Sequence, residues 1–542
     1  MRGRGTEGFS LGNAAGMNVE RRGLSLRVLP VVLLAAAASL VVSVAAVRDI
    51  PSAADFLAAL TEAGAPRERL LFTLAQAAGA TALGVAVGLV ASWFLARAGM
   101  PLAPVFRVAM LVPVAVPGVA FALGLRELAA GDLAPAALVV WGHAAFAAGV
   151  TAWVVTPAWG SSEPRLVDQA VLLGSTRWRA LLAGARRSVG SSLVLACALG
   201  FANAAAAVGS VLLLGDEATW TVEALLLREA QSGDTGVTAS LAGIQLLLGL
   251  VAYLGARRWT AGAGGPLRAS AGVRAAGVVV LLVLVAPLLA PVVALVAGAV
   301  RVEAGASSAF AGLLDAELAG AGVGRSLAWS ATYALTAGVV ATALAWLVAP
   351  YVASLRRPRF RGLPVALLAL VLLVSPVVSA LGAREAAQAL EVDLQRTWAV
   401  MAGVHALVVF PVALRVLTSV AHVDGHRLAE AAVLLGQGPR SARWRWRRRY
   451  VLRGVLSSVL IALALLIGEV GAAALLAPAS AVPATVSVLE ASPPGRDAPS
   501  LALAVATVLS GAAVVAFTLG EWLRRSAGSA GTGAGGASVE GR

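Results

Sequence analysis

Apolar runs of about 20 residues recur along this chain, and each is long enough for a helix to cross a bilayer. Inside the hydrocarbon core every backbone polar group must be paired within the protein, which leaves helices as the fitting structure for such runs. A chain that is 59% hydrophobic and 13% charged cannot hide this much apolar surface from water. We therefore predict an all-α, multi-pass membrane protein. About twelve spans are expected, at 27–47, 70–95, 105–124, 135–157, 191–214, 236–256, 275–300, 326–352, 363–382, 397–419, 454–477 and 499–522.

The loop charges predict the orientation of these spans. All 42 basic residues are arginine, and most fall in cytoplasmic loops if the amino terminus is cytoplasmic, while most acidic residues fall outside. We expect both termini in the cytoplasm and a location in the cell (inner or cytoplasmic) membrane. Because the basic excess is spread over loops that set topology, the net charge of +14 indicates membrane lipids as partners and no nucleic acid. Arg21 and Arg22 before the first run leave a signal peptide open, although the length of that run favours a retained helix.

A ten-residue segment occurs twice, 262 positions apart. Residues 165–174 and 427–436 share seven identities, and Asp168 of the first copy corresponds to Glu430 of the second. Both copies lie in arginine-rich loops between apolar runs. Each reads as a short helix that ends at a glycine, Gly174 or Gly436, where a left-handed residue stops helices. An amphipathic loop helix that packs on its own protein or on headgroups is the alternative, but two copies at equivalent places favour a docking surface for another protein.

The same offset extends beyond the loops and defines the domain organisation. His143 corresponds to His405, and Gly209 to Gly471. Since six spans is an even number, both halves enter the membrane from the same side, as parallel repeats do. We expect the following segments: a cytoplasmic segment at 1–26, a first six-helix unit at 27–256 (core 70–256), a basic cytoplasmic linker at 257–274, a second six-helix unit at 275–525 (core 326–522) and a disordered Gly/Ser/Ala tail at 526–542.

The second copy of the repeat resembles a known family motif. Glu430-Ala431-Ala432 followed by Gly436 matches the E-A-A-x-x-x-G coupling loop of importer-type ABC permeases, and Asp168, Ala170 and Gly174 form a weaker version. Downstream, 468–472 resembles the family's G-E-[FL]-G-A segment. Residues 201–223 resemble thiamine and ferric-iron permeases, which also fuse two units on one chain. The resemblance covers about 70–256 and 326–522.

Two positions depart from the family pattern. Arg186-Arg187 and Arg448-Arg449 stand where the family has Leu-Pro, and Ala207 stands where the second half has Glu469. The resemblance implies a permease of an ATP-driven importer, in which a pair of separate ABC ATPase subunits docks on the two coupling loops. It also implies an extracytoplasmic solute-binding protein that delivers ferric iron or thiamine; related permeases handle polyamines and small oxyanions as well.

No pattern of catalytic residues is visible in the sequence, so we predict a protein that is not an enzyme and has no cofactor of its own. A phosphate-binding loop of the G-x-x-x-x-G-K-[ST] type needs a lysine, and the chain contains none, which places ATP on a partner subunit. No metal site is expected, because neither His143 nor His405 has another ligand at coordinating spacing. Cys197 is expected to be a packing residue.

A few residues remain as candidates for the transport pathway. Glu469 is the only acid inside an expected span, where a charge must face the bundle or a pore, and with Gly471 and Gly209 it is a candidate gate. The alternative for Glu469 is a hydrogen bond between helices, and for the two histidines it is helix packing. Arginines between 440 and 453, with Trp444 and Trp446, fit either an acidic partner or lipid headgroups.

Two other classes of protein share the expected topology. A secondary transporter with six-plus-six repeats, driven by an ion gradient, is the main alternative, although its spans would be expected to hold more protonatable residues. A membrane scaffold that moves no solute is the other. An importer needs an ATPase, a carrier works without one, and a scaffold transports nothing.

Overall fold

The computed structural model describes residues 41–50, 64–159, 164–233, 235–256, 269–301, 309–354, 375–394, 398–421 and 439–529, with isolated positions at 38, 52, 54, 56, 61 and 267. Within these ranges the chain forms helices almost throughout, apart from a two-stranded pairing of β1 (Glu317–Leu318) with β2 (Ala321–Gly322). The fold is that of an all-α, multi-pass membrane protein, as the apolar runs predict.

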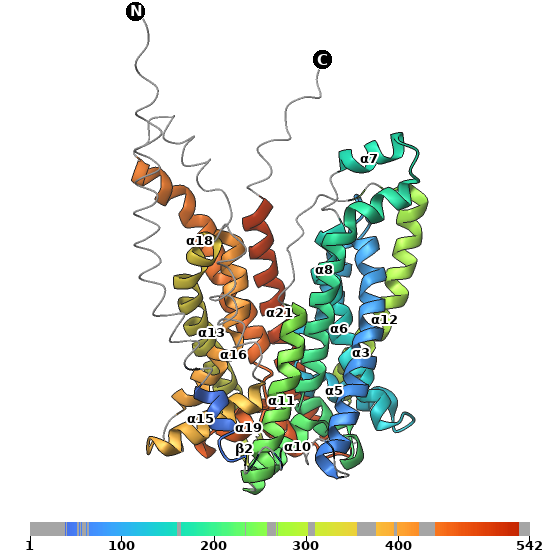
Figure 1. Cartoon of the computed structure of the whole chain (residues 1–542). Coiled ribbons are helices and arrows are strands. Elements are labelled where there is room, and N and C mark those ends of the chain that lie inside the picture. Colours follow the sequence, from blue (N-terminus) through green and yellow to red (C-terminus); the bar gives the residue numbers. More distant parts are fainter. Residues whose placement is uncertain are drawn as a thin grey trace, which may run out of the picture.

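Helices of the first half run side by side, with their connections at the two ends (Figure 1). They are α3 (Ala65–Leu95), α4 (Ala103–Ala115), α5 (Gly118–Ala129), α6 (Pro135–Trp159), α7 (Pro164–Leu172), α8 (Arg177–Ala206), α9 (Gly209–Leu214), the turn η1 (Glu217–Thr219), α10 (Val222–Ser232) and α11 (Thr235–Ala256). The second half has α12 (Ala271–Val300), α13 (Val323–Ser354), α15 (Pro376–Ala389), α16 (Ala399–Ala421), α18 (Pro439–Leu466), α19 (Ala473–Leu476), η2 (Ala479–Ala481), α20 (Ala484–Ala491) and α21 (Ser500–Ser529).

In the described ranges, eight helices are long and apolar enough to cross a membrane, or nine spans if α4 and α5 together make one. Most of the expected span at 27–47 and residues 363–374 of the ninth lie outside the described residues. Two expected boundaries also shift. The helix α12 begins at Ala271, inside the expected linker, and α21 continues to Ser529, inside the expected disordered tail.

Three expected spans are interrupted rather than continuous. The run at 105–124 bends by 102° between α4 and α5, where Pro117 precedes the first residue of α5. The run at 191–214 ends its long helix at Ala206 before the short α9, and the run at 454–477 ends at Leu466 before the short α19. The last two interruptions occupy equivalent places in the repeat, so the break is a property of both halves.

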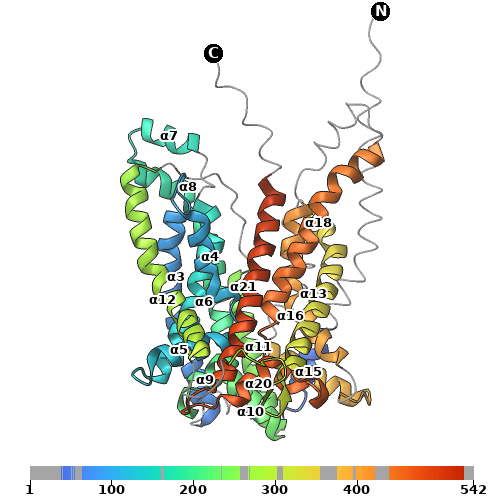
Figure 2. The same ribbon diagram turned by 180° about the vertical axis from the view of Figure 1, so that it is seen from behind.

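The two ends of the bundle differ in what they carry. The loop helix α7 and the last turns of α21 lie at one end, which we call the α7 end, while α10, α15 and α19 lie at the other, the α10 end (Figures 1 and 2). The helix α7 contacts α8 and projects beyond the bundle.

Small residues let the helices approach closely. A Cβ atom on Gly84 or Gly88 of α3 would collide with the backbone of Ala144 or Ala148 of α6, so the spacing of the two helices requires glycine at both places. Pairs of small residues four apart are a common means of packing helices in membranes, where no hydrophobic effect drives helices together.

The first helix of each half packs on the other half. The helix α12, which opens the second half in sequence, lies against α3, α4 and α5 of the first half (Figure 2). Gly124 of α5 touches the carbonyl of Pro291 in α12, and its counterpart Gly382 of α15 touches the carbonyl of Val42. The described part of the opening segment, 41–46, and the helix α12 therefore each contact the other half, and the expected boundary at 257–274 separates the halves in sequence but not in space.

Candidate functional site

A cavity of about 250 Å³ lies where the interrupted helices meet. Its wall contains Pro117 from the α4–α5 bend, Ala207 from the α8–α9 break and Gly468 from the α18–α19 break. Both halves thus contribute to one cavity. Non-helical backbone at membrane depth is tolerated where it lines a cavity or is buried in protein, and broken helices of this kind mark binding sites in transporters.

The polar side of this cavity comes from the first half. His143 is buried, and its Nδ1 lies 2.9 Å from Oε1 of Gln76 while its Nε2 lies 3.3 Å from Oγ of Ser210. Gln76 Nε2 donates to the carbonyl of Ala204 at 2.7 Å, which fixes Oε1 as the atom facing the ring. An amide oxygen only accepts, so Nδ1 of His143 carries the proton and Nε2 accepts from the Ser210 hydroxyl. Both ring nitrogens of His143 are thus occupied, so hydrogen-bonding groups for a molecule in the cavity come from Ser210 and Asn203.

The equivalent histidine of the second half has a different partner. His405 Nε2 lies 2.9 Å from Oε2 of Glu469, and the exposed fractions of the two side chains are 2% and 10%. The other carboxylate oxygen of Glu469 accepts from the Ala472 N–H at 3.0 Å, at the start of α19. Tyr333 stands edge-on to the His405 ring, with ring centroids 6.3 Å apart. The structure thus brings together Glu469 and His405, which the sequence placed 64 residues apart.

A second buried carboxylate lies close to this pair. Glu223 of α10 is fully buried and accepts from the Val377 N–H at 3.3 Å and from the Ser375 hydroxyl, at the first turn of α15. Its other oxygen has no partner among the described residues. Burial is the main cause that raises the pKa of Glu223 to about 8, and the negative charge of Glu469 adds to the effect. Glu223 belongs to the first half and its hydrogen-bond donors belong to the second.

Gly209 and Gly471 sit at this contact between the halves. A Cβ atom on Gly209 would lie 2.6 Å from methyl groups of both Val119 and Val470. One on Gly471 would lie 2.9 Å from a methyl group of Val377 and 3.1 Å from Oε1 of Glu469. Close approach of their neighbours therefore requires glycine at both places, and the role of candidate gate that the sequence suggested for them stays a prediction.

Two arginines join the halves at the α10 end in a reciprocal manner. Arg126 of α5 donates to the carbonyl of Ser492 at 2.9 Å, directly after α20. Arg384 of α15 donates to the carbonyl of Ala230 in α10 at 2.8 Å. Ser492 and Ala230 are 262 positions apart, so an arginine of each half donates a hydrogen bond to the equivalent carbonyl of the other half.

The first of the two expected coupling loops is described and forms a helix as expected. The helix α7 opens at Pro164, and Gly174 has φ of 88°. The Gly174 N–H donates to Val171 O at 3.0 Å and the Ser175 N–H to Ala170 O at 2.9 Å, the bonding pattern that ends helices at a left-handed glycine. Asp168 is exposed.

The apolar end of this helix is also uncovered. Leu172 and Leu173 are 86% and 88% exposed, well beyond the other large apolar side chains at the α7 end. The second loop, with Glu430, Ala431, Ala432 and Gly436, lies outside the described residues, as do the side chains of Trp444 and Trp446.

Some functional candidates could not be chosen from the sequence. Gln76, Ser210 and Glu223 gain their significance only from partners more than 60 residues away. One signal was present: Glu223 lies in a stretch that resembles the permease family. Across the described ranges, no group of three His, Cys, Asp or Glu side chains is arranged to hold a metal ion.

The chain was compared with protein-family models and with curated proteins. No protein-family model matches the chain, and no curated protein is similar to it in sequence.

Proposed function

We propose that this chain is the membrane permease of an ATP-driven ABC importer. One observation carries the proposal: two sequence-related halves break their helices at equivalent places, and a cavity lined by both halves lies at the breaks. A solute can cross at such a place if the helices separate first on one side of the cavity and then on the other. This arrangement of parallel repeats around a shared site is what alternating access requires.

The repeated loop helix supports the choice of an importer powered by a partner. The apolar end of α7, with Leu172 and Leu173, faces away from the bundle and offers a surface for another protein to cover. In this proposal the α7 end is cytoplasmic, and a pair of ABC ATPase subunits docks there on α7 and on the second copy around Glu430. The two access states must bind the nucleotide-loaded ATPase with different affinities, or ATP would not drive transport.

We propose ferric iron or thiamine as the solute, delivered by an external binding protein at the α10 end. This choice rests on the resemblance of residues 201–223 to permeases for those solutes. The cavity offers Ser210 and Asn203 as transient hydrogen-bonding partners rather than a tight site. Weak binding at this place suits a pathway, because a solute that is held strongly would not leave.

Reconstitution tests the proposal directly. The chain is placed in vesicles with its genomically neighbouring ATPase and binding protein, and uptake of labelled thiamine or ferric iron is followed with ATP on the α7 side. We expect uptake that requires ATP, the ATPase and the binding protein together. Uptake that proceeds without the ATPase would overturn the proposal.

A secondary transporter driven by an ion gradient remains the second candidate. The buried carboxylates Glu469 and Glu223, with His405 beside one of them, form a group that a proton-driven carrier could use. Uptake that a proton uncoupler abolishes and that is indifferent to ATP would favour this alternative.

A further inference from the structure

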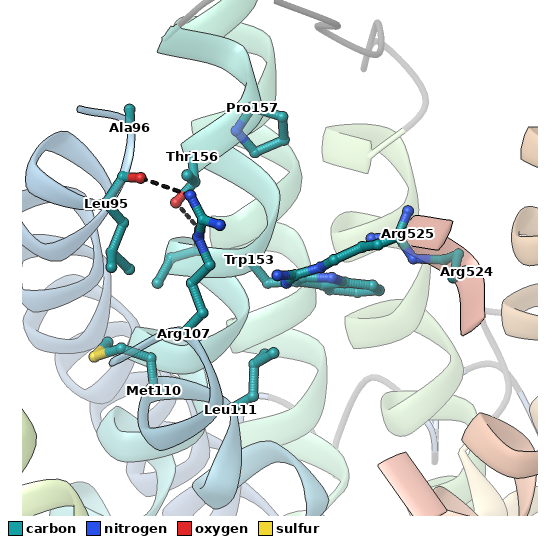
Figure 3. Close-up of a pocket in the computed structure, with 11 residues that line it drawn as sticks. Leu95, Ala96, Arg107, Met110, Leu111, Trp153, Thr156, Pro157, Arg524 and Arg525 are labelled. Carbon is teal, nitrogen blue, oxygen red and sulfur yellow. Dashed lines mark hydrogen bonds between the residues drawn. The ribbon is translucent and has the colours of Figure 1, made fainter. Parts of the chain in front are cut away.

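A second cavity lies between the halves at the α7 end, about 360 Å³ in volume. Its first-half wall holds Arg107 of α4 with Trp153 and Thr156 of α6, and its second-half wall holds Arg524 and Arg525 of α21. Figure 3 shows Arg107 on one side and Arg524 and Arg525 reaching in from the other. The cavity is separate from the one at the helix breaks, and none of its residues takes part there.

The charges around this cavity are poorly balanced. Glu521 binds Arg524 through two oxygens, at 2.7 Å and 2.8 Å, and also accepts from Trp153 Nε1 at 2.9 Å. Its hydrogen-bonding capacity is thus largely occupied by these two neighbours. Arg107 donates to the carbonyl of Leu95 at 3.0 Å, and within the described residues neither Arg107 nor Arg525 has a carboxylate at ion-pair distance.

The guanidinium groups of Arg107 and Arg525 act on each other, and the nearby carboxylate of Glu521 is shared by Arg525 with Arg524. The neighbouring charge that Arg107 feels is that of Arg525, and the effect is repulsive. Arg107 is half-buried, so water screens this repulsion only in part. Two like charges held on opposite walls of a cavity, one in each half, favour separation of the halves unless an anion lies between them.

We propose that this cavity binds a phosphate group, either of a lipid headgroup or of free phosphate. Arginine suits phosphate because its planar fork matches two oxygens at once, and such charge-assisted bonds are among the strongest in proteins. A phosphate between Arg107 and Arg525 removes the repulsion and links α4 of the first half to α21 of the second. The anion therefore stabilises the contact between the halves at the α7 end, independently of which solute the protein carries.

The test measures the thermal stability of the full chain in an uncharged detergent. Inorganic phosphate is titrated against chloride at equal ionic strength, and phosphatidylglycerol is compared with diacylglycerol, which lacks the phosphate, in mixed micelles. The variants are Arg107→Gln and Arg525→Gln. The control is Arg179→Gln, which removes an exposed arginine at the same end.

We expect an added anion to raise the Tm of the wild type, and each cavity variant to need about tenfold or more of it for the same rise. A response to inorganic phosphate identifies the free anion as sufficient, and a response to phosphatidylglycerol alone identifies a lipid headgroup. The exposed position of Arg525 keeps its variant foldable if Arg107→Gln fails to fold. No rise in Tm with either anion, or an equal loss of response in Arg179→Gln, would overturn the proposal.

Discussion

Replacing Glu469 by alanine should destabilise the protein through two lost hydrogen bonds. The first is the bond from His405 Nε2 to the carboxylate at 2.9 Å, and a bond to a charged group contributes about 1.5–3 kcal/mol. The second is the bond from the Ala472 N–H at the start of α19, whose loss costs about 1 kcal/mol, as removal of a helix cap does. The sum is about 2.5–4 kcal/mol, which at roughly 2 °C per kcal/mol lowers Tm by about 5–8 °C.

Two variants make this prediction specific. Glu469→Gln keeps an oxygen for Ala472 and an amide for the ring, so it should lose only about 1–2 kcal/mol. Ser210→Ala removes the weaker partner of the equivalent histidine, at 3.3 Å, and should cost less than Glu469→Ala. The Tm values are measured by differential scanning fluorimetry in detergent. A Tm for Glu469→Ala within 1 °C of the wild type, or no lower than that of Ser210→Ala, would show that the carboxylate does not stabilise the break between α18 and α19. A margin of 1 °C corresponds to about half a kcal/mol.

Three further predictions concern other parts of the chain. With its pKa of about 8 in the folded protein and 4.5 as the ordinary value, Glu223 contributes stability that is fully present below pH 4.5 and is lost as the pH rises through 8. The free energy of unfolding should fall across that window by up to about 1.4 kcal/mol per pH unit, with Tm falling alongside it, and Glu223→Gln should flatten this dependence; an unchanged slope in the variant would contradict this. Gly209→Val should overpack the contact with Val119 and Val470 and cost about 1–3 kcal/mol in thermal stability, whereas an unshifted Tm would show that the halves relax apart freely. Gly436→Arg should reduce co-purification of the ATPase more than Gly174→Arg does, because the second loop keeps the full family motif; equal losses in a pull-down would show that both loops are used alike.

The sequence predicted the helices well because hydrocarbon thickness fixes the length of an apolar run. It also predicted the end of α7, where Gly174 adopts the left-handed conformation that its place after the last leucine requires. The end of a helix at a glycine depends only on the residues next to it, so it can be predicted without knowing any distant contact.

The interruptions and the polar partners were not predictable in the same way. The run at 105–124 is apolar apart from Arg107 near its start, and nothing in its hydropathy distinguishes a straight helix from one that turns by 102° at Pro117. Glu469 stood out as a lone acid, but the sequence could not tell which donor it meets, since His405 reaches it only through the packing of α16 on α18 and α19. Glu223 was overlooked because it lies in a loop by hydropathy, and its burial and its hydrogen bond from the Val377 N–H arise only when α10 packs on its neighbours, among them α15 of the other half.

The contacts that the opening segment of each half makes with the other half also set an order for how the protein is completed during synthesis. The segment around Val42 finds its packing partner, Gly382, more than 300 residues later in the chain. At about 5–20 residues per second, that segment waits roughly 20–70 s before its partner is made. Gly124 of α5 waits in the same way for α12, although for a shorter time. A ribosome that stops before α15 would therefore leave the segment at 41–50 packed on helices of the first half alone, where Ala46 lies among buried residues of α10 and α11, with its contact to Gly382 still to form.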